Sequence, residues 1–167
     1  SFVTVPASSS HGLSGLTQSN YKTTGASPND AAGFATLQTT YENTTYKCGS
    51  QAASTINGSG NPFSGTNGCS DENYMTIFSG TLNVAAAGTY EFSVDGDDAI
   101  DLTIDGVVQV GWYGGHGSCN CNTNSVSVSL SAGTHTIRFR HHEQSGGDEY
   151  YLRWRNSATS AMTDYKV

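Results

Sequence analysis

Basic residues and long apolar runs are scarce in this sequence. It has 7 Lys and Arg residues against 14 Asp and Glu residues, which gives a formal net charge of −7 at pH 7. Proteins that bind nucleic acids or anionic membrane surfaces normally present a basic patch, so we expect neither partner. No apolar run approaches the ~20 residues that cross a bilayer, and the N-terminus lacks the basic and apolar regions of a signal peptide. We expect no membrane insertion and interpret the chain as a mature or excised domain.

The composition also disfavours a helical protein. Only 13% of the 167 residues are charged, and Ser, Thr, Asn and the 20 glycines supply most of the polarity. These residue types favour turns and strands and weaken helix interiors. The length is that of one domain, and we expect a single all-β domain over residues 1–167.

The four cysteines, Cys48, Cys69, Cys119 and Cys121, are an even number in a chain of extracellular composition, which favours two disulfides. Three pairings are possible, and sequence alone does not decide among them. The favoured pairing joins Cys48 to Cys69 across a polar loop and Cys119 to Cys121 in a tight ring. A zinc site formed by His116, Cys119 and Cys121 is the alternative, although no fourth ligand at the usual spacing is evident.

The first 70 residues have no clear hydrophobic period. Ser, Thr, Asn, Gly and Ala dominate them, and residues 49–70 have the composition of a long loop. We predict that residues 1–70 are mainly coil held by a Cys48–Cys69 disulfide, and that the chain contains no helix of useful length.

Period-two alternation becomes clear after Tyr74 and predicts five or more consecutive strands. The predicted inward-facing residues are Tyr90, Phe92, Val94, Ile100, Leu102, Ile104, Val126, Val128, Leu130, Ile137, Phe139, Leu152 and Trp154. Turn residues separate these strands at 85–89, 104–106, 131–135 and 144–148. This pattern is typical of an antiparallel sandwich or barrel.

Asp97 and Asp98 are adjacent in a segment that otherwise alternates like a strand. In a trans extended chain one of the two side chains faces the core, where an unpaired charge is costly. A shared calcium ion resolves the conflict, because calcium accepts about 6 to 8 oxygen ligands in flexible geometry. An EF-hand loop beginning at Asp95 fails, since Ile100 stands where glycine is needed and Gly106 where glutamate is needed. An acidic turn with solvated carboxylates remains the alternative.

The second half of the chain resembles the PA14 domain, a β-sandwich module of adhesins, glycosidases and toxins. The resemblance covers about residues 12–156 and is strongest over residues 75–156. It rests on ordered motifs: GTYEF (88–92), the Asp97-Asp98 pair, LTIDG (102–106), Trp112, LSAGTHTI (130–137), EQSGG (143–147) and LRW (152–154). It implies an antiparallel β-sandwich, here with long N-terminal loops.

The resemblance also implies a site. In sugar-binding PA14 domains a cis peptide joins the Asp pair, and one calcium ion bound by both carboxylates coordinates neighbouring sugar hydroxyls. The third side-chain ligand is then Gln144, with the backbone carbonyls of Ser145 and Gly146 as further ligands. Flocculin-type members place an asparagine in a different loop, so their glycan preferences do not transfer to this chain.

Residues 111–125 are expected to border the same site. Trp112 and Tyr113 have rings that can stack on a sugar, with Tyr113 the more exposed, whereas Trp112 is equally consistent with a core position. His116, Asn120 and Asn122 can supply directional hydrogen bonds.

Catalytic motifs have little support in this sequence. The HHEQSGG segment at 141–147 does not match HExxH, and no GxSxG elbow occurs. On a strand, His141 and His142 point to opposite faces, which favours a structural or surface role. We expect no enzymatic activity.

Three functions are therefore compared. The first is a calcium-dependent lectin domain of a secreted or cell-surface adhesin, a monomeric domain of a longer chain that binds cell-surface glycans or glycoproteins. The second is a structural or protein-interaction PA14 module. The third is a substrate-recognition module of a larger glycosidase. Two sequons, at Asn43 and Asn57, do not separate them.

Overall fold

The protein is a two-layer β-sandwich with one short helix. The computed structural model describes residues 12–156. In chain order the elements are β1 (Gly12–Lys22), α1 (Ala31–Tyr41), β2 (Lys47–Ala53), β3 (Asn57–Ser59), β4 (Tyr74–Val84), β5 (Gly88–Gly96), β6 (Ala99–Ile104), β7 (Val107–Trp112), β8 (Ser125–Leu130), β9 (Gly133–Glu143) and β10 (Glu149–Asn156). The predicted antiparallel sandwich is confirmed.

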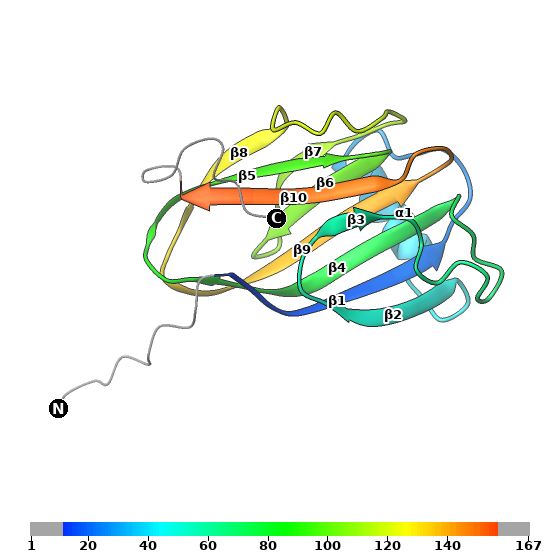
Figure 1. Ribbon diagram of the computed structural model, residues 1–167, viewed down its shortest axis with the longest axis horizontal. Helices are drawn as coiled ribbons and strands as arrows, with labels where there is room; N and C mark the ends of the chain where they lie inside the picture. The colour runs from blue at the N-terminus through cyan, green and yellow to red at the C-terminus, as the bar shows by residue number, and fades with distance from the viewer. Residues whose placement is uncertain (1–11, 157–167) are drawn as a thin grey trace.

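The two sheets have six and four strands. The larger has the order β2-β1-β4-β9-β6-β7 and the smaller the order β3-β10-β5-β8, and the paired strands are antiparallel. In Figure 1 the smaller sheet lies nearer the viewer, and α1 lies behind the larger sheet. The helix therefore covers the outer face of the larger sheet and leaves the space between the sheets to the main core.

The main core confirms the alternation read from the sequence after Tyr74. Its buried residues include Phe92, Val94, Ile100, Leu102, Ile104, Ile137, Phe139, Leu152 and Trp154, while Val126 and Val128 are partly buried against it. The outer face of β5 differs from a simple alternation, because Ser93 and Asp95 are each 1% exposed. The loop from β7 to β8 covers this part of β5, since the Cys119 and Cys121 amides donate to the Asp95 carboxylate.

The prediction of coil over residues 1–70 is wrong for much of that segment. Strand β1 lies between β2 and β4, and two of its polar side chains, Gln18 and Asn20, are buried. Gln18 and Asn20 have a relative exposure of 4% and 0%, and the Asn20 amide donates to the Thr76 hydroxyl at 2.9 Å. Because these amides bond to each other and to neighbouring strands, the strand needs no apolar period to be buried.

The prediction of no useful helix is also wrong. Helix α1 has 11 residues, and Asp30 caps its first turn by accepting a hydrogen bond from the Gly33 amide at 2.7 Å. Phe34 is fully buried and packs with Met75 and Ile77 of β4. Phe34 is the one buried residue of this helix, with Leu37 and Tyr41 partly buried against the same cluster, which explains why no broad apolar stripe marks it in the sequence.

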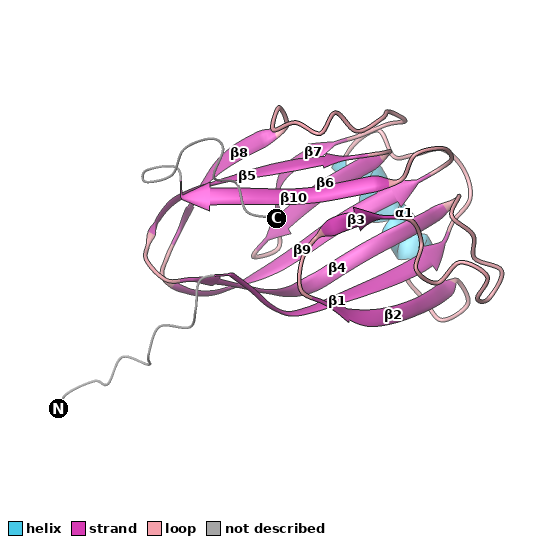
Figure 2. Ribbon diagram, in the orientation of Figure 1, coloured by secondary structure: helices cyan, strands magenta, loops and turns pink. Residues whose placement is uncertain are grey.

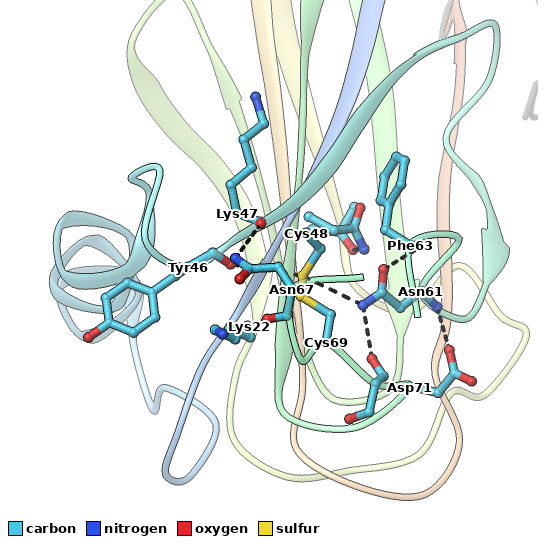
Figure 3. Close-up of a disulfide and its surroundings, with 12 residues drawn as sticks. Lys22, Tyr46, Lys47, Cys48, Asn61, Phe63, Asn67, Cys69 and Asp71 are labelled. Atoms are coloured by element: carbon cyan, nitrogen blue, oxygen red, sulfur yellow. Dashed lines mark hydrogen bonds between the residues drawn. A yellow bond between two sulfur atoms is a disulfide. The ribbon is translucent and has the colours of Figure 1, made fainter. Parts of the chain in front are cut away.

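A disulfide between Cys48 and Cys69 joins the start of β2 to the loop before β4, as the favoured pairing predicted. Figure 3 shows the amides that surround it. The Asn61 side chain donates to the Ser70 carbonyl, and the Asn67 side chain donates to the Lys47 carbonyl at 3.0 Å. The long loop of residues 60–73 is therefore held by side-chain hydrogen bonds as well as by the disulfide.

Several connections meet at one end of the sandwich. Figure 2 shows the loops of residues 23–30, 60–73 and 144–148 at the right-hand end, where β5 also passes into β6. The Asp97-Asp98 pair occupies that junction between β5 and β6. The sandwich thus places segments distant in sequence around the two aspartates.

Candidate functional site

The Asp97-Asp98 peptide bond is cis, as the resemblance implied. Backbone groups on both sides fix its position: the Asp97 amide donates to the Glu149 carbonyl at 2.9 Å and the Asp98 amide to the His142 carbonyl at 3.1 Å. The Nε2 atom of His141 lies 2.6 Å from the Asp97 carbonyl, and it must donate because a carbonyl only accepts. Of the two predicted roles, structural or surface, the full burial of His141 and this bond support the structural one.

The Asp98 carboxylate accepts three hydrogen bonds from three different segments. Its Oδ1 accepts from the His116 amide at 3.0 Å. Its Oδ2 accepts from the Gln144 amide at 2.9 Å and from the Ser27 hydroxyl at 3.0 Å. The side chain is buried, with 6% relative exposure, so these donors fix its orientation.

A buried histidine supports this arrangement from the outer face of the larger sheet. The two ring nitrogens of His142 lie 2.9 Å from the Ser27 hydroxyl and 3.0 Å from the Thr23 hydroxyl. Burial lowers the pKa of His142 to about 4, so the ring is neutral near pH 7. Since Ser27 gives its proton to Asp98, the neutral ring donates from Nδ1 to Ser27 and accepts from Thr23. The buried pair His141 and His142 thus face opposite sides of β9, as predicted, and both are structural.

Asp97 is the more accessible carboxylate of the pair. Burial, and then the negative charges of Asp98 and Glu149, raise its pKa to about 6. Its Oδ2 lies close to the backbone of Gly147, where a Cβ atom would be only 2.6 Å away. The absence of a side chain at Gly147 is what leaves room for this carboxylate.

Glu143 is a third carboxylate at the site, and the sequence analysis did not identify it. It ends β9 with 0% exposure, and neither of its oxygens has a hydrogen-bond partner among residues 12–156. Burial and then the charges of Asp98 and Asp97 raise its pKa to about 9. One signal was available: the alternation of Ile137, Phe139 and His141 places Glu143 on the core side of the strand.

The three carboxylates fit a hard divalent cation. Ligand oxygens of Asp97, Asp98 and Glu143 all lie within 4.8 Å of one another. Calcium–oxygen distances are about 2.3 to 2.6 Å, so ligands on opposite sides of one calcium ion are separated by about this distance. The unpartnered oxygens of Glu143 and the like charge of the cluster both favour a bound cation.

The predicted ligand loop lies beside these carboxylates. Residues 144–147 are exposed, and the backbone of Gln144 bonds directly to Asp98. The Gln144 side-chain oxygen accepts from the Ser27 amide at 3.3 Å. Ser145 and Gly146 follow in the exposed turn, where Gly146 has a φ of 108°. The structure thus brings Gln144 to the Asp pair and leaves its amide in contact with the 23–30 loop.

Trp112 and His116 form a stacked pair at the edge of the site. Their ring centroids are 3.6 Å apart and the planes differ by 10°. Trp112 also packs against the main core. One face of the indole is therefore covered by His116, whose backbone contacts Asp98.

Tyr113 turns toward the sheet. Its hydroxyl donates to Oδ2 of Asp101 at 3.1 Å, and burial together with the Asp101 charge raises its pKa. The next residue, Gly114, donates to the Pro28 carbonyl at 2.7 Å. Tyr113 thus ties the start of this loop to the region beneath α1.

The tip of the loop is held by Arg153 and a tight disulfide. Cys119 and Cys121 are bonded to each other, so the zinc alternative that used both sulfurs is wrong. The Arg153 guanidinium donates to the side-chain oxygens of Asn120 at 2.6 Å and Asn122 at 3.3 Å. The structure thus places both asparagines on Arg153, over the smaller sheet.

The fold and the site together define a β-sandwich domain with a buried acidic cluster under the loops at one end. Residues 33–165 match the sequence model of the PA14 domain. This match covers most of the chain, and the protein belongs to the PA14 domain family. No curated protein sequence matches it significantly.

Solved structures share this fold at low sequence identity. The PA14 sugar-binding domain from an RTX adhesin has a TM-score of 0.67 and 18% identity, with 93% of each chain covered. The PA14 domain of the antifreeze protein MpAFP has a TM-score of 0.66 and 20% identity over 98% of this chain and 92% of that one. The epithelial adhesin 6 A domain from Candida glabrata, in complex with Galb1-3GlcNAc, has a TM-score of 0.59 and 12% identity over 98% and 88%.

One similar solved structure is much longer than this chain. This chain spans 44% of an anti-sigma factor domain-containing protein, with a TM-score of 0.64 and 16% identity over 90% of this chain. Within residues 12–156, no helix has the length and apolar character needed to cross a membrane.

Proposed function

We propose that this domain binds carbohydrate through a calcium ion held by the Asp97-Asp98 pair, as part of a secreted or cell-surface adhesin. The observation that carries the proposal is the cis Asp97-Asp98 pair, whose two carboxylates lie beside the exposed turn of residues 144–147. Two structural relatives are described as a sugar-binding domain and as a complex with Galb1-3GlcNAc, which supports the same class of ligand.

In this proposal the chain supplies a fixed, oxygen-rich cradle. The cis pair presents two carboxylates, and Gln144, Ser145 and Gly146 offer amide and carbonyl oxygens from the exposed turn. When bound, calcium supplies positive charge and open coordination positions for neighbouring sugar hydroxyls. The donors on Asp98 hold that carboxylate in place before ligand binding, which lowers the ordering cost of recognition.

The segment of residues 111–125 is proposed to border the sugar. His116 is the nearest to the ion site, since its amide bonds to Asp98. Trp112, Tyr113, Asn120 and Asn122 contact other parts of the protein, so they shape and hold the loop, and direct sugar contacts from them need side-chain movement. Weak binding of single sugars is expected, with useful adhesion arising from many copies at once.

The extracellular assignment is supported by two disulfides and by the adhesin relatives. We propose a monomeric domain within a longer chain that binds cell-surface glycans or glycoproteins. A structural or protein-interaction module, or a recognition module of a glycosidase, remains the alternative function. We infer no catalytic role for the acidic cluster, because its carboxylates are assigned to the cation.

A glycan array tests this function directly. The domain is incubated with the array in about millimolar calcium, a concentration chosen to fill even a weak extracellular calcium site, and again after chelation. We expect binding to a defined set of glycans that disappears without calcium and returns when calcium is restored. Binding that persists unchanged after chelation would contradict the calcium bridge, and no binding in either condition would favour the structural module.

Gly147→Ala is expected to weaken calcium binding about tenfold while leaving the fold intact. The added Cβ would lie 2.6 Å from Oδ2 of Asp97, so the carboxylate must swing away from the cluster. The matched control is Gly117→Ala, whose Cβ would lie 3.8 Å from the same oxygen, an ordinary contact distance. Calorimetric titration with calcium measures both variants, and equal affinities would show that the Asp97 position does not matter.

A further inference from the structure

We propose that Glu143 is a direct ligand of the cation and closes the protein-facing side of its coordination shell. This inference rests on the proposed function, because it assumes that the Asp97-Asp98 pair holds a metal ion. It adds a third carboxylate to a site otherwise formed by the Asp97-Asp98 pair and the turn after β9.

The position of Glu143 is the first argument. It pairs with Tyr74 of the neighbouring strand β4, and both residues are 0% exposed. The side chain lies on the core side of β9, one position beyond His141 on that face. A carboxylate placed there approaches Asp97 and Asp98 from beneath and leaves the solvent side of the cluster to the exposed residues 144–147.

The missing partners of Glu143 are the second argument. Buried carboxylates in proteins normally accept hydrogen bonds or pair with a basic side chain. Neither Glu143 oxygen has a hydrogen-bond partner within the described part of the chain, and no salt bridge there includes it. A cation in contact with the two Glu143 oxygens would supply the missing partner.

The surrounding charges are the third argument. The ionisable groups that act on Glu143 most strongly are Asp98, Asp97, Asp148 and Glu72, and all are acidic. Each of them repels a charged Glu143, so none of these four groups compensates its charge. A divalent ion attracts all of these carboxylates at once, which explains why an otherwise costly group is kept here.

The third carboxylate also predicts the class of ion. Three charged oxygen ligands around one site favour hard cations, and a higher ligand charge increases affinity. Terbium, a trivalent hard cation, is therefore expected to replace calcium, and the aromatic residues near the site provide a route for sensitised emission. Figure 1 places the junction between β5 and β6 and the end of β9 at the same end of the sandwich. Terbium emission would report the binding of the ion at this end.

Glu143→Gln tests the inference because it keeps the shape of the side chain and removes its charge. We expect calcium and terbium affinities to fall by about tenfold or more. The melting temperature without metal should stay the same or rise, since a buried carboxylate without partners has been removed. The rise in melting temperature on adding calcium should shrink. A residue with only a structural role would instead lower the metal-free melting temperature and leave the metal affinity unchanged.

Glu72→Gln is the matched control. Glu72 is exposed and acts on Glu143 through its charge, so the variant removes one acidic charge nearby without removing the proposed ligand. Its calcium affinity should change by less than about twofold, as expected for a screened surface charge. An equal loss in both variants would mean that general charge, and not ligation, is responsible, which would overturn the inference.

The outcomes separate this inference from the proposed function. If the unmodified domain binds neither calcium nor terbium, the proposed function fails and the inference fails with it. If the domain binds calcium and Glu143→Gln binds it equally well, only the inference fails. Should the variant not fold, a crystal structure of the unmodified domain with calcium decides: a Glu143 oxygen within about 2.6 Å of the ion supports ligation, and one beyond that distance overturns it.

Discussion

Asp98→Asn is expected to lower calcium affinity by about a hundredfold and to abolish calcium-dependent glycan binding. The substitution removes a charged ligand. It also places an amide NH₂ group against one of the three donors that now bond to the carboxylate, which are the His116 amide, the Gln144 amide and the Ser27 hydroxyl. Two donors facing each other repel, so the loops that carry them lose their common anchor. Calorimetric titration with calcium and a repeat of the glycan array measure the two losses.

Asp105→Asn provides the control for the change in charge. Asp105 lies in the turn after β6, at the opposite end of that strand from Asp98, and its side chain is 52% exposed. The same chemical change there breaks a contact with His135 at 2.6 Å and leaves the acidic cluster intact. Calcium affinity should remain unchanged in this variant. If Asp98→Asn also retained full affinity, the cluster could not be the calcium site.

The strands after Tyr74 were predictable because their inward-facing side chains are apolar and pack between the two sheets. Residues such as Phe92, Leu102 and Phe139 alternate with polar residues and are fully buried between the sheets. The two-residue period in the sequence then shows which face of each strand packs against the core. The exception on β5 depends on Asp95, which is buried because the Cys119–Cys121 loop folds over it. Burial by a loop that is distant in the sequence does not change the hydrophobic period of the strand.

The N-terminal elements were not predictable in the same way. Strand β1 buries Gln18 and Asn20 through hydrogen bonds to partners far away in the sequence, including Tyr150 and Thr76. Polar residues that satisfy one another in this manner look like loop residues when read alone. Helix α1 did offer one local signal, the capping residue Asp30, but a single cap without an apolar stripe was too little evidence.

Some residues of the candidate site could be predicted from the sequence, and others could not. Asp97 and Asp98 were found because the family resemblance gave their pattern a meaning, and the cis bond agrees with it. Ser27 lies in a polar loop 71 positions from Asp98, so only the fold reveals their hydrogen bond. Glu143 is an intermediate case, since strand alternation places it inward but the adjoining histidines obscure that signal.

Arg140→Ala is expected to destabilise the protein by about 3 to 5 kcal/mol, the usual cost of breaking a buried ion pair. Arg140 is 4% exposed and donates two hydrogen bonds to the Asp101 carboxylate. Its Nε lies 2.8 Å from Oδ1 of Asp101, and its second terminal nitrogen lies 2.5 Å from Oδ2. Its guanidinium also lies 4.5 Å from the centre of the Phe34 ring and donates to Gln38, so it joins α1 to the larger sheet. Removal leaves the Asp101 carboxylate, which has 0% exposure, without its counter-charge. Urea unfolding at neutral pH measures the loss.

Arg138→Ala separates this effect from the loss of any arginine on the strand. Arg138 lies two positions away on the same face of β9, and its side chain is 40% exposed. Its guanidinium lies 3.8 Å from the Glu42 carboxylate, which is a long distance for an ion pair. An exposed pair of this kind contributes about 0 to 1 kcal/mol. A loss of only about 0 to 1 kcal/mol in both variants would contradict the expected contribution of the buried Arg140–Asp101 pair. A large loss only at position 140 would identify the Arg140–Asp101 pair as the anchor of α1, and thereby of the preceding loop that brings Ser27 to Asp98.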